Sequence, residues 1–235
     1  MPSFYCPELT CSLQQIELSG DQFHHLAHVM RHKSGDLIKL NSGKGYIGTG
    51  IIQQVDKHKA VIDIAELNFT KPSQPAYAIA FSLRSKNDEW LVEKTTELGV
   101  TDLFPITTQY SVRNPSVNTL LRFRQSALSA IKQCDNPWLP VIHPVHSLKS
   151  VIDAIRQADY EPVAAVESRP DLWMSDLNLS DNYCFIVGPE GGFDKEELDF
   201  LSESRIRSIS ISGKVLRAET AAIALAAQHN LIHRN

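Results

Sequence analysis

The sequence predicts an α/β fold in which a small β-rich module precedes a larger domain with a mostly parallel sheet. After residue 76, strand-like apolar runs alternate with segments of helical periodicity, which is typical of consecutive βα units. In the first 70 residues, short apolar runs are separated by glycines, which indicates short strands and tight turns. The 235 residues are 43% hydrophobic and 21% charged, so a disordered chain, a coiled coil and a disulfide mini-protein are excluded.

The first part of the chain contains one helical stretch and several short strands. Residues 20–32 place Phe23, Leu26, Ala27 and Met30 on one helical face. Strand-like runs follow at residues 37–40, 46–52 and 60–65. Two prolines in residues 71–75 mark a linker. We therefore predict two domains, at 1–70 and 76–235, joined by the linker 71–75.

The second part alternates between strands and helices. Strands are predicted over residues 76–83, 100–107, 162–166, 183–187 and 209–213. Helices are predicted over residues 87–98, 116–134, 194–201 and 217–231, and the first of them ends at Gly99. A further helix is predicted to begin after Ser147, which can cap it. Asp194 can cap its helix, with Glu197 at the capping-box position.

The sharpest motif joins a buried strand to a helix through Gly188-Pro189-Glu190-Gly191-Gly192. Ligands of open α/β sheets bind beyond the carboxyl ends of the strands, and glycines let the backbone approach them closely. Pro189 removes an amide and Glu190 adds a negative charge, so the loop favours a neutral or cationic ligand over a phosphate. A plain strand-to-helix turn explains the same residues without any ligand.

A second candidate segment leads into the last predicted helix. Glu219 and Thr220 fall in its first turn, where capping and the helix dipole explain them without a function. Arg217 is different, because a cation is unfavourable at the positive end of a helix. We therefore take Arg217 as a functional candidate.

Other chemistries find no support in the sequence. The sequence lacks the motifs of a P-loop, a dinucleotide-binding fingerprint, a nucleophile elbow and an H-E-x-x-H zinc site. The four cysteines form no C-x-x-C pair, and scattered cysteines suit a reducing compartment. His28 and His32 have i, i+4 spacing, but without a nearby acidic or cysteine partner we expect no metal site. No signal peptide or long apolar run is visible, so we expect a cytoplasmic protein.

Taken in order, these motifs resemble a known family. The segment GPEGGF, followed by LRAETA at the start of the final helix, resembles the RsmE family of 16S rRNA methyltransferases, which belongs to the SPOUT class. Further matches are His25-Leu26, Val29-Met30-Arg31, Gly35-Asp36, Gly43-Lys44-Gly45, Lys86, Glu93-Lys94, Glu97-Leu98-Gly99-Val100 and Pro105. The resemblance implies an N-terminal PUA-like β-barrel domain and a C-terminal domain with a deep trefoil knot.

The resemblance also implies an activity and a set of site residues. The activity is S-adenosylmethionine-dependent methylation of N3 of a specific uridine in small-subunit rRNA, with Arg217 and Glu219 as catalytic candidates. The cofactor would be held by Glu167, Gly188, Pro189, Glu190, Gly191, Ile211, Ser212 and Leu216. RNA contacts would come from Arg31, Lys44, Arg84, Lys86, Lys94 and Arg113. Such domains dimerise, so a homodimer through the C-terminal domain is expected, with 16S rRNA or the small ribosomal subunit as partner.

Three departures from the family pattern bear on the site. Ile211-Ser212 stands where Leu-Gly is usual in the family, and the glycine follows at Gly213. This change can alter the path of the backbone around the cofactor. Lys132-Gln133 replaces a common Glu-Gln, and Asn136 falls where an arginine is usual. These two changes affect RNA contacts or the dimer surface.

Two rival functions remain open, and the net charge bears on both. One rival is a non-catalytic RNA-binding protein of the same fold, and the other is a metabolic α/β enzyme with a nucleotide cofactor. The net charge of −4 alone argues against a nucleic-acid partner. However, residues 1–72 contain seven basic and seven acidic residues, so the whole excess lies in the second part. The composition therefore excludes a strongly basic, indiscriminate binder and not a selective one.

Overall fold

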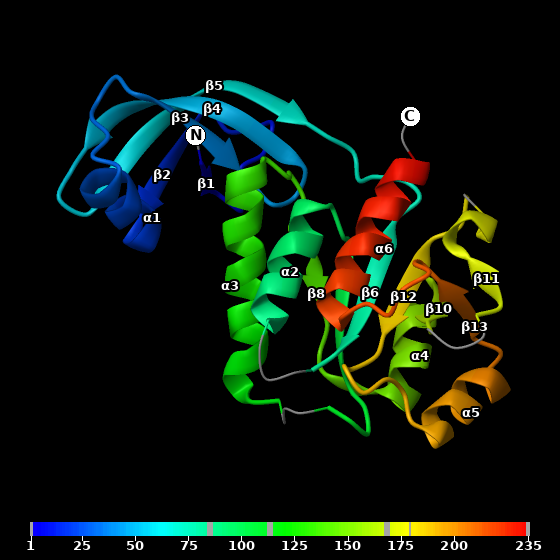
Figure 1. Cartoon of the computed structure of the whole chain (residues 1–235). Coiled ribbons are helices and arrows are strands. Elements are labelled where there is room, and N and C mark those ends of the chain that lie inside the picture. The colour runs from blue at the N-terminus through cyan, green and yellow to red at the C-terminus, as the bar shows by residue number, and fades with distance from the viewer. Residues whose placement is uncertain (1, 84–86, 112–114, 167–169, 179, 234–235) are drawn as a thin grey trace. The chain divides into compact units, whose positions relative to one another are not determined.

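The computed structural model describes residues 2–83, 87–111, 115–166, 170–178 and 180–233 (Figure 1). The chain divides into two compact units. The N-terminal unit comprises Met1–Pro72 and Leu128–Leu139, and the C-terminal unit comprises Ser73–Ala127 and Pro140–Asn235. The predicted domains at 1–70 and 76–235 left the second segment of the N-terminal unit out. The predicted domain bounds, with the linker at 71–75, stay a prediction.

The N-terminal unit is built on a five-stranded sheet in the order β1-β3-β4-β5-β2. The strands are β1 (Ser3–Tyr5), β2 (Gln15–Ser19), β3 (Leu37–Asn41), β4 (Tyr46–Val55) and β5 (Lys59–Phe69). β1 pairs with β3 in parallel, and the other pairs are antiparallel. Phe4, Ile38, Leu40, Ile52 and Ile62 are among the buried core residues of this unit. The three predicted strands are confirmed, and the sequence missed β1 and β2.

The helical stretch predicted over residues 20–32 is shorter and less regular than expected. A single α-helical turn, α1 (Gly20–His24), continues as a π-helix, η1 (His25–Val29). The amide of Met30 donates to the carbonyl of His25 at 2.9 Å, which is the wider π spacing. At Arg31 the backbone adopts a φ of 56°, which ends the helix. Phe23 and Leu26 are buried, as the predicted face requires.

The end of a distant helix completes the N-terminal unit. Helix α3 (Val117–Cys134) reaches this unit with its last turns. There Asn41 Nδ2 donates to the carbonyls of Ile131 (3.3 Å) and Asn136 (2.8 Å). The amide of Gly45 donates to the carbonyl of Pro137 at 2.8 Å. About 90 residues of sequence separate these partners, so no local pattern predicts them.

The C-terminal unit contains an eight-stranded sheet, and every pair in it is parallel. The spatial order is β11-β13-β10-β12-β6-β7-β8, and β9 also pairs with β7. The main strands are β6 (Tyr77–Ser82), β7 (Asp102–Thr107), β10 (Glu161–Ala165), β12 (Tyr183–Val187) and β13 (Arg207–Ser210). Short strands are β8 (Val141–Ile142), β9 (His146–Ser147) and β11 (Leu172–Trp173). The predicted α/β class with a parallel sheet is confirmed, whereas the trefoil knot stays a prediction.

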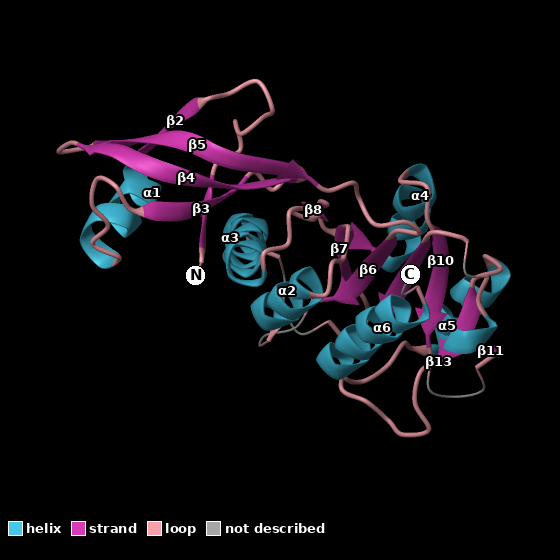
Figure 2. Cartoon of the chain, turned by 90° about the horizontal axis from the view of Figure 1, so that it is seen from above, coloured by secondary structure: helices cyan, strands magenta, loops and turns pink. Residues whose placement is uncertain are grey.

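Helices cover both faces of this sheet (Figure 2). Helices α2 (Asp88–Glu97) and α6 (Ala218–Ile232) lie on one face, where α6 packs against β6 and β12. Helices α4 (Leu148–Gln157) and α5 (Lys195–Glu203) lie on the other face and share one core. Both predicted caps are confirmed, because Ser147 forms a capping box with Ser150 and Asp194 forms one with Glu197. A 3-10 turn, η2 (Met174–Asp176), follows β11.

Because the strands are parallel, their carboxyl ends share one edge of the sheet. Strands β12, β10 and β13 are neighbours, so the loops that follow them lie together at that edge. Within the described residues, no helix is both long enough and apolar enough to cross a membrane.

Candidate functional site

A cavity of about 560 Å³ opens at the carboxyl ends of β10, β12 and β13. Its size falls in the range of about 300–1,000 Å³ that is usual for small-molecule sites. Three separate chain segments contribute its lining, and they fall within residues 165–173, 187–198 and 209–221. The lining residues include Ala165, Val166, Trp173, Gly188, Pro189, Glu190, Gly191, Phe193, Ile211, Ser212, Lys214, Leu216 and Ala218.

The loop between β12 and α5 forms one wall of the cavity. The amide of Gly192 donates to the carbonyl of Pro189 at 2.9 Å, which closes a tight turn over Glu190 and Gly191. Gly192 has a φ of 73°, a conformation that side-chain-bearing residues rarely adopt. The ring of Phe193 lies against Gly188, where an added Cβ would come within 3.1 Å of it. Backbone therefore lines the wall, which leaves room for a ligand to approach closely.

The loop between β13 and α6 forms the opposite wall. Ser210 Oγ donates to the carbonyl of Ser212 at 3.1 Å, and the amide of Lys214 donates to Ser212 Oγ at 3.1 Å. Gln228, from α6, donates its Nε2 to the carbonyl of Ile211 at 3.0 Å. These bonds define the path of the backbone where the sequence departs from the family pattern. The change to Ile211-Ser212 is thus accommodated by local hydrogen bonds.

The structure brings most of the expected cofactor residues together around this cavity. Those that line it are Gly188, Pro189, Glu190, Gly191, Ile211, Ser212 and Leu216. Glu167 lies outside the described residues. The sequence missed Trp173, which lines the cavity from β11 with a side chain that remains 51% exposed. A two-residue strand has no periodicity, so only its place beside β13 reveals it.

The two catalytic candidates lie at the start of α6. Arg217 is the N-cap residue, is exposed, and makes no capping hydrogen bond through its side chain. Glu219 is only 6% exposed, and Asn87 Nδ2 donates to its Oε1 at 3.2 Å. Ala218, between them, lines the cavity. Arg217 is therefore accessible to a substrate, while Glu219 is buried in the packing between α6 and the start of α2.

The expected RNA contacts are spread over both units. In the N-terminal unit Arg31 and Lys44 are exposed, and Lys44 Nζ donates to the carbonyl of Pro7 at 2.9 Å. In the C-terminal unit Lys94 Nζ lies 2.7 Å from Glu93 Oε1 and 2.8 Å from Glu97 Oε1. The remaining candidates, Arg84, Lys86 and Arg113, lie outside the described residues.

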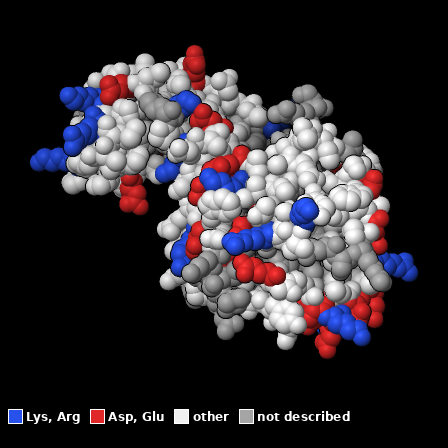
Figure 3. Space-filling model, viewed as in Figure 1, with Lys and Arg blue, Asp and Glu red and all other residues white. Residues whose placement is uncertain are grey.

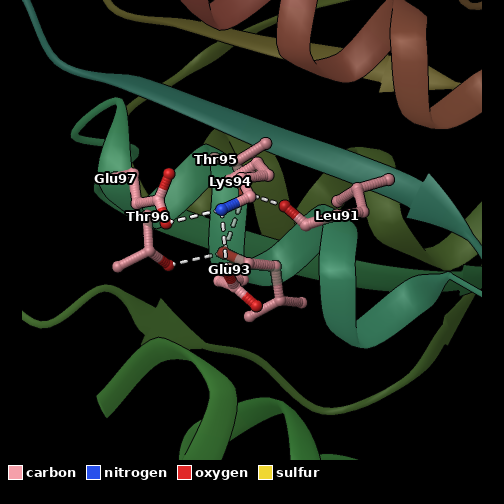
Figure 4. Close-up of polar contacts among 7 residues, drawn as sticks. Leu91, Glu93, Lys94, Thr95, Thr96 and Glu97 are labelled. Carbon is pink, nitrogen blue, oxygen red and sulfur yellow. Dashed lines mark hydrogen bonds and ion pairs between the residues drawn. The ribbon is translucent and has the colours of Figure 1, made fainter. Parts of the chain in front are cut away.

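Acidic neighbours surround much of the basic charge. Figure 3 shows lysine and arginine side chains on one face beside acidic ones, with a group of basic side chains at one end of the N-terminal unit. The close-up of Lys94 shows its ammonium between two carboxylates (Figure 4). Hydrogen bonds that Lys94 donates, first to Glu93 and then to Glu97, raise the pKa of Lys94, so it stays charged but partly neutralised. Two of the three N–H donors of this ammonium are therefore already used within the helix.

The histidine-rich helix has an acidic neighbour that the sequence analysis did not anticipate. His32 Nδ1 lies 3.1 Å from Asp36 Oδ2. Hydrogen bonds, first from the amide of Lys33 and then from His32, lower the pKa of Asp36. The described part of the chain nevertheless contains no group of three or more potential ligands that could hold a metal ion.

The groups that line the cavity suit a ligand with a largely apolar body and a positive charge. Trp173, Phe193 and Leu216 offer apolar surface, and backbone carbonyls and amides offer hydrogen bonds. Glu190 is exposed at the rim and can attract a cation. Pro189 lacks an amide, so the loop does not form the N–H cradle that phosphates require.

Comparison with known proteins agrees with this geometry. A family model described as an RNA methyltransferase domain matches residues 70–230, and one described as an RNA methyltransferase PUA domain matches residues 18–65. Ribosomal RNA small subunit methyltransferase E of Bacillus subtilis is 28% identical over 236 residues, covering 92% of this chain and 91% of that protein. The protein of the same name from Rickettsia conorii is 28% identical over 223 residues, covering 93% and 90%.

A solved structure resembles the whole chain. The crystal structure of a ribosomal RNA small subunit methyltransferase E from Neisseria gonorrhoeae, bound to S-adenosyl methionine, superposes with a TM-score of 0.89. Its sequence is 25% identical, and the match covers 99% of this chain and 98% of that one.

Proposed function

Because the chain belongs to the RNA methyltransferase family, we propose that it transfers a methyl group from S-adenosylmethionine to N3 of a uridine in 16S rRNA. The observation that supports this most directly is the backbone-lined cavity between the loop after β12 and the loop after β13. Relatives that match nearly the whole chain are named as small-subunit rRNA methyltransferases, and one solved relative holds this cofactor.

The cavity fits this cofactor in size and in charge. S-adenosylmethionine supplies an activated methyl group on a sulfonium cation when it is bound. Residues 188–192 and 211–216 would hold it through backbone atoms, and Trp173 and Leu216 would cover its apolar surface. The exposed carboxylate of Glu190 suits the positive charge of the ligand. No nucleophilic side chain is then required, because the chain has to position the two reactants and to handle the N3 proton.

Arg217 and Glu219 are assigned to the handling of the N3 proton. Uracil N3–H is a weak acid, so its anion needs stabilisation or its proton needs an acceptor. The exposed guanidinium of Arg217 can stabilise negative charge on a uracil carbonyl oxygen. The carboxylate of Glu219 is the proton acceptor in this proposal, although its burial at the start of α6 also gives it a structural role.

The remaining parts of the proposal concern partners. Arg31, Lys44 and Lys94 would contact RNA phosphates, as would Arg84, Lys86 and Arg113. We further propose that the chain acts in the cytoplasm as a homodimer on 16S rRNA or on the small ribosomal subunit. Within the apolar segment 221–227 of the last helix, Ile223, Ala224 and Ala227 are not buried, so they are the candidate surface for the second copy.

In vitro methylation of small-subunit rRNA, followed by mass mapping, tests the function. We expect one N3-methyluridine, together with calorimetric binding of S-adenosylmethionine. RNA binding without cofactor binding would favour the non-catalytic alternative. Thermal stabilisation by NAD or ATP, and not by S-adenosylhomocysteine, would favour a metabolic enzyme instead.

A further inference from the structure

An exposed tyrosine lies beside the cofactor loop but outside the cavity. Tyr110 is 51% exposed and follows the carboxyl end of β7, at the same edge of the sheet as the cavity. Its ring lies against Gly191, where an added Cβ would be 3.4 Å from the ring carbon Cδ2. Gly191 itself lines the cavity. The tyrosine ring thus lies next to the loop that would hold the cofactor.

A network of hydroxyl groups keeps the turn that carries Tyr110 rigid. The amide of Ser111 donates to the carbonyl of Thr108 at 3.0 Å, so Tyr110 lies within a tight turn. Ser82, from the end of β6, lies 2.8 Å from both Thr108 Oγ1 and Ser111 Oγ. The amide of Thr108 also donates to Ser111 Oγ at 2.8 Å. An exposed aromatic ring on a rigid turn is already organised to bind a partner.

One carboxylate joins this turn to the cofactor loop. Glu197 Oε1 accepts a hydrogen bond from the amide of Gln109 at 2.8 Å. Its Oε2 accepts from the amide of Asp194 at 3.0 Å, which completes the capping box of α5. The side chain of Glu197 therefore bridges the turn that carries Tyr110 and the end of the cofactor loop. Glu197 is a positioning residue in this arrangement.

We propose that Tyr110 is a substrate-binding residue, on whose ring the target uracil stacks while N3 faces the cofactor loop. This inference rests on the proposed function. An enzyme that modifies a base must take the base out of its stack, and aromatic rings are the usual replacement partners. Trp173 is equally exposed, but it lines the cavity, so its ring belongs with the cofactor. Because the ring of Tyr110 lies beside Gly191, a base stacked on it would lie next to the cofactor loop.

Kinetics of variants test the proposal. Tyr110→Ala should lower kcat/KM for RNA about tenfold or more, mainly through KM, while the Kd for S-adenosylmethionine stays within twofold. Tyr110→Phe keeps the ring and should retain wild-type values. Val141→Ala is the control, because it also removes exposed apolar surface, on β8. It should change neither kcat/KM for RNA nor the Kd for S-adenosylmethionine. Glu197→Gln, which loses one of two acceptors, should show a smaller loss of kcat/KM than Tyr110→Ala.

Photocrosslinking gives a readout that does not depend on turnover. An rRNA fragment with 5-iodouridine at the target position should crosslink, with S-adenosylhomocysteine present, to the peptide that contains Tyr110. A crosslink to Trp173, no crosslink, or full kcat/KM for Tyr110→Ala in an active enzyme would overturn the assignment. Failure of the proposed function looks different, because the wild-type chain would then transfer no methyl group to rRNA.

Discussion

The C-terminal unit should lose stability in mild acid, because one buried histidine binds a proton more readily in the unfolded chain than in the folded one. His229, in α6, is 3% exposed and packs between Tyr77 and His233, with ring centroids 4.4 and 4.2 Å away. Among the residues that the structure describes, neither ring nitrogen of His229 has a hydrogen-bond partner. Burial, and secondly the nearby His233, lower its pKa from 6.5 to about 4. Burial raises the pKa of Tyr77, so that group stays neutral throughout.

The sign and size of the effect follow from proton linkage. Between pH 6.5 and about 4 the unfolded chain binds a proton at His229 and the folded chain does not, so stability falls as the pH falls. Each unit of pKa difference corresponds to about 1.4 kcal/mol, so the loss between about pH 7.5 and 4.5 is about 2.5 kcal/mol. Below the folded pKa the loss levels off. His229→Phe keeps a ring of similar size in the same packing and removes the titration.

Urea unfolding at several pH values, followed by circular dichroism, measures this difference. The free energy of unfolding of His229→Phe, relative to wild type, should rise by about 2.5 kcal/mol between about pH 7.5 and 4.5. His58→Phe, at an exposed position in the N-terminal unit, provides the control and should follow wild type. Parallel pH profiles for wild type and His229→Phe would refute the reasoning.

Three further substitutions test the site and the N-terminal unit. Arg217→Ala should leave the Kd for S-adenosylmethionine unchanged in calorimetry and lower kcat at least tenfold, about 1.4 kcal/mol of barrier; normal turnover would remove Arg217 from the mechanism. Gln228→Leu takes the donor from the carbonyl of Ile211 and should weaken cofactor binding about fivefold, which an unaltered Kd would contradict. Gly45→Ala should lower the melting temperature and reduce stability by about 2 kcal/mol or more, because φ is 97° and the new Cβ would lie 2.6 Å from the rings of Phe69 and Trp138. Gly213→Ala meets nothing within 4 Å, so a comparable loss of stability there would show that the effect is not specific to Gly45.

The sequence predicted the elements whose signals are local. Ser147 and Asp194 lie directly before apolar helical patterns, and the structure confirms both caps. The buried strand before Gly188 has only apolar residues, so its place inside a parallel sheet could be predicted. The loops around the cavity followed from the same reasoning, because the carboxyl ends of parallel strands meet at one edge.

Residues whose role depends on distant neighbours could not be predicted. Tyr110 is an ordinary turn residue in the sequence, and its place beside Gly191 becomes visible in the structure. Trp173 lies on a strand of two residues that exists because β13 is beside it. The transition from α1 to η1 was missed because Leu26 and Phe23 satisfy an apolar face in either kind of helix.

The course of α3 limits how the chain can be divided or recombined. A fragment that ends at residue 72 lacks residues 128–139, and with them the carbonyls that Asn41 and Gly45 require as acceptors. Loss of those acceptors would leave the buried amide of Asn41 unsatisfied. The N-terminal unit is therefore not a transferable module. A chimera that exchanges it with another protein has to exchange two separate stretches of sequence at once.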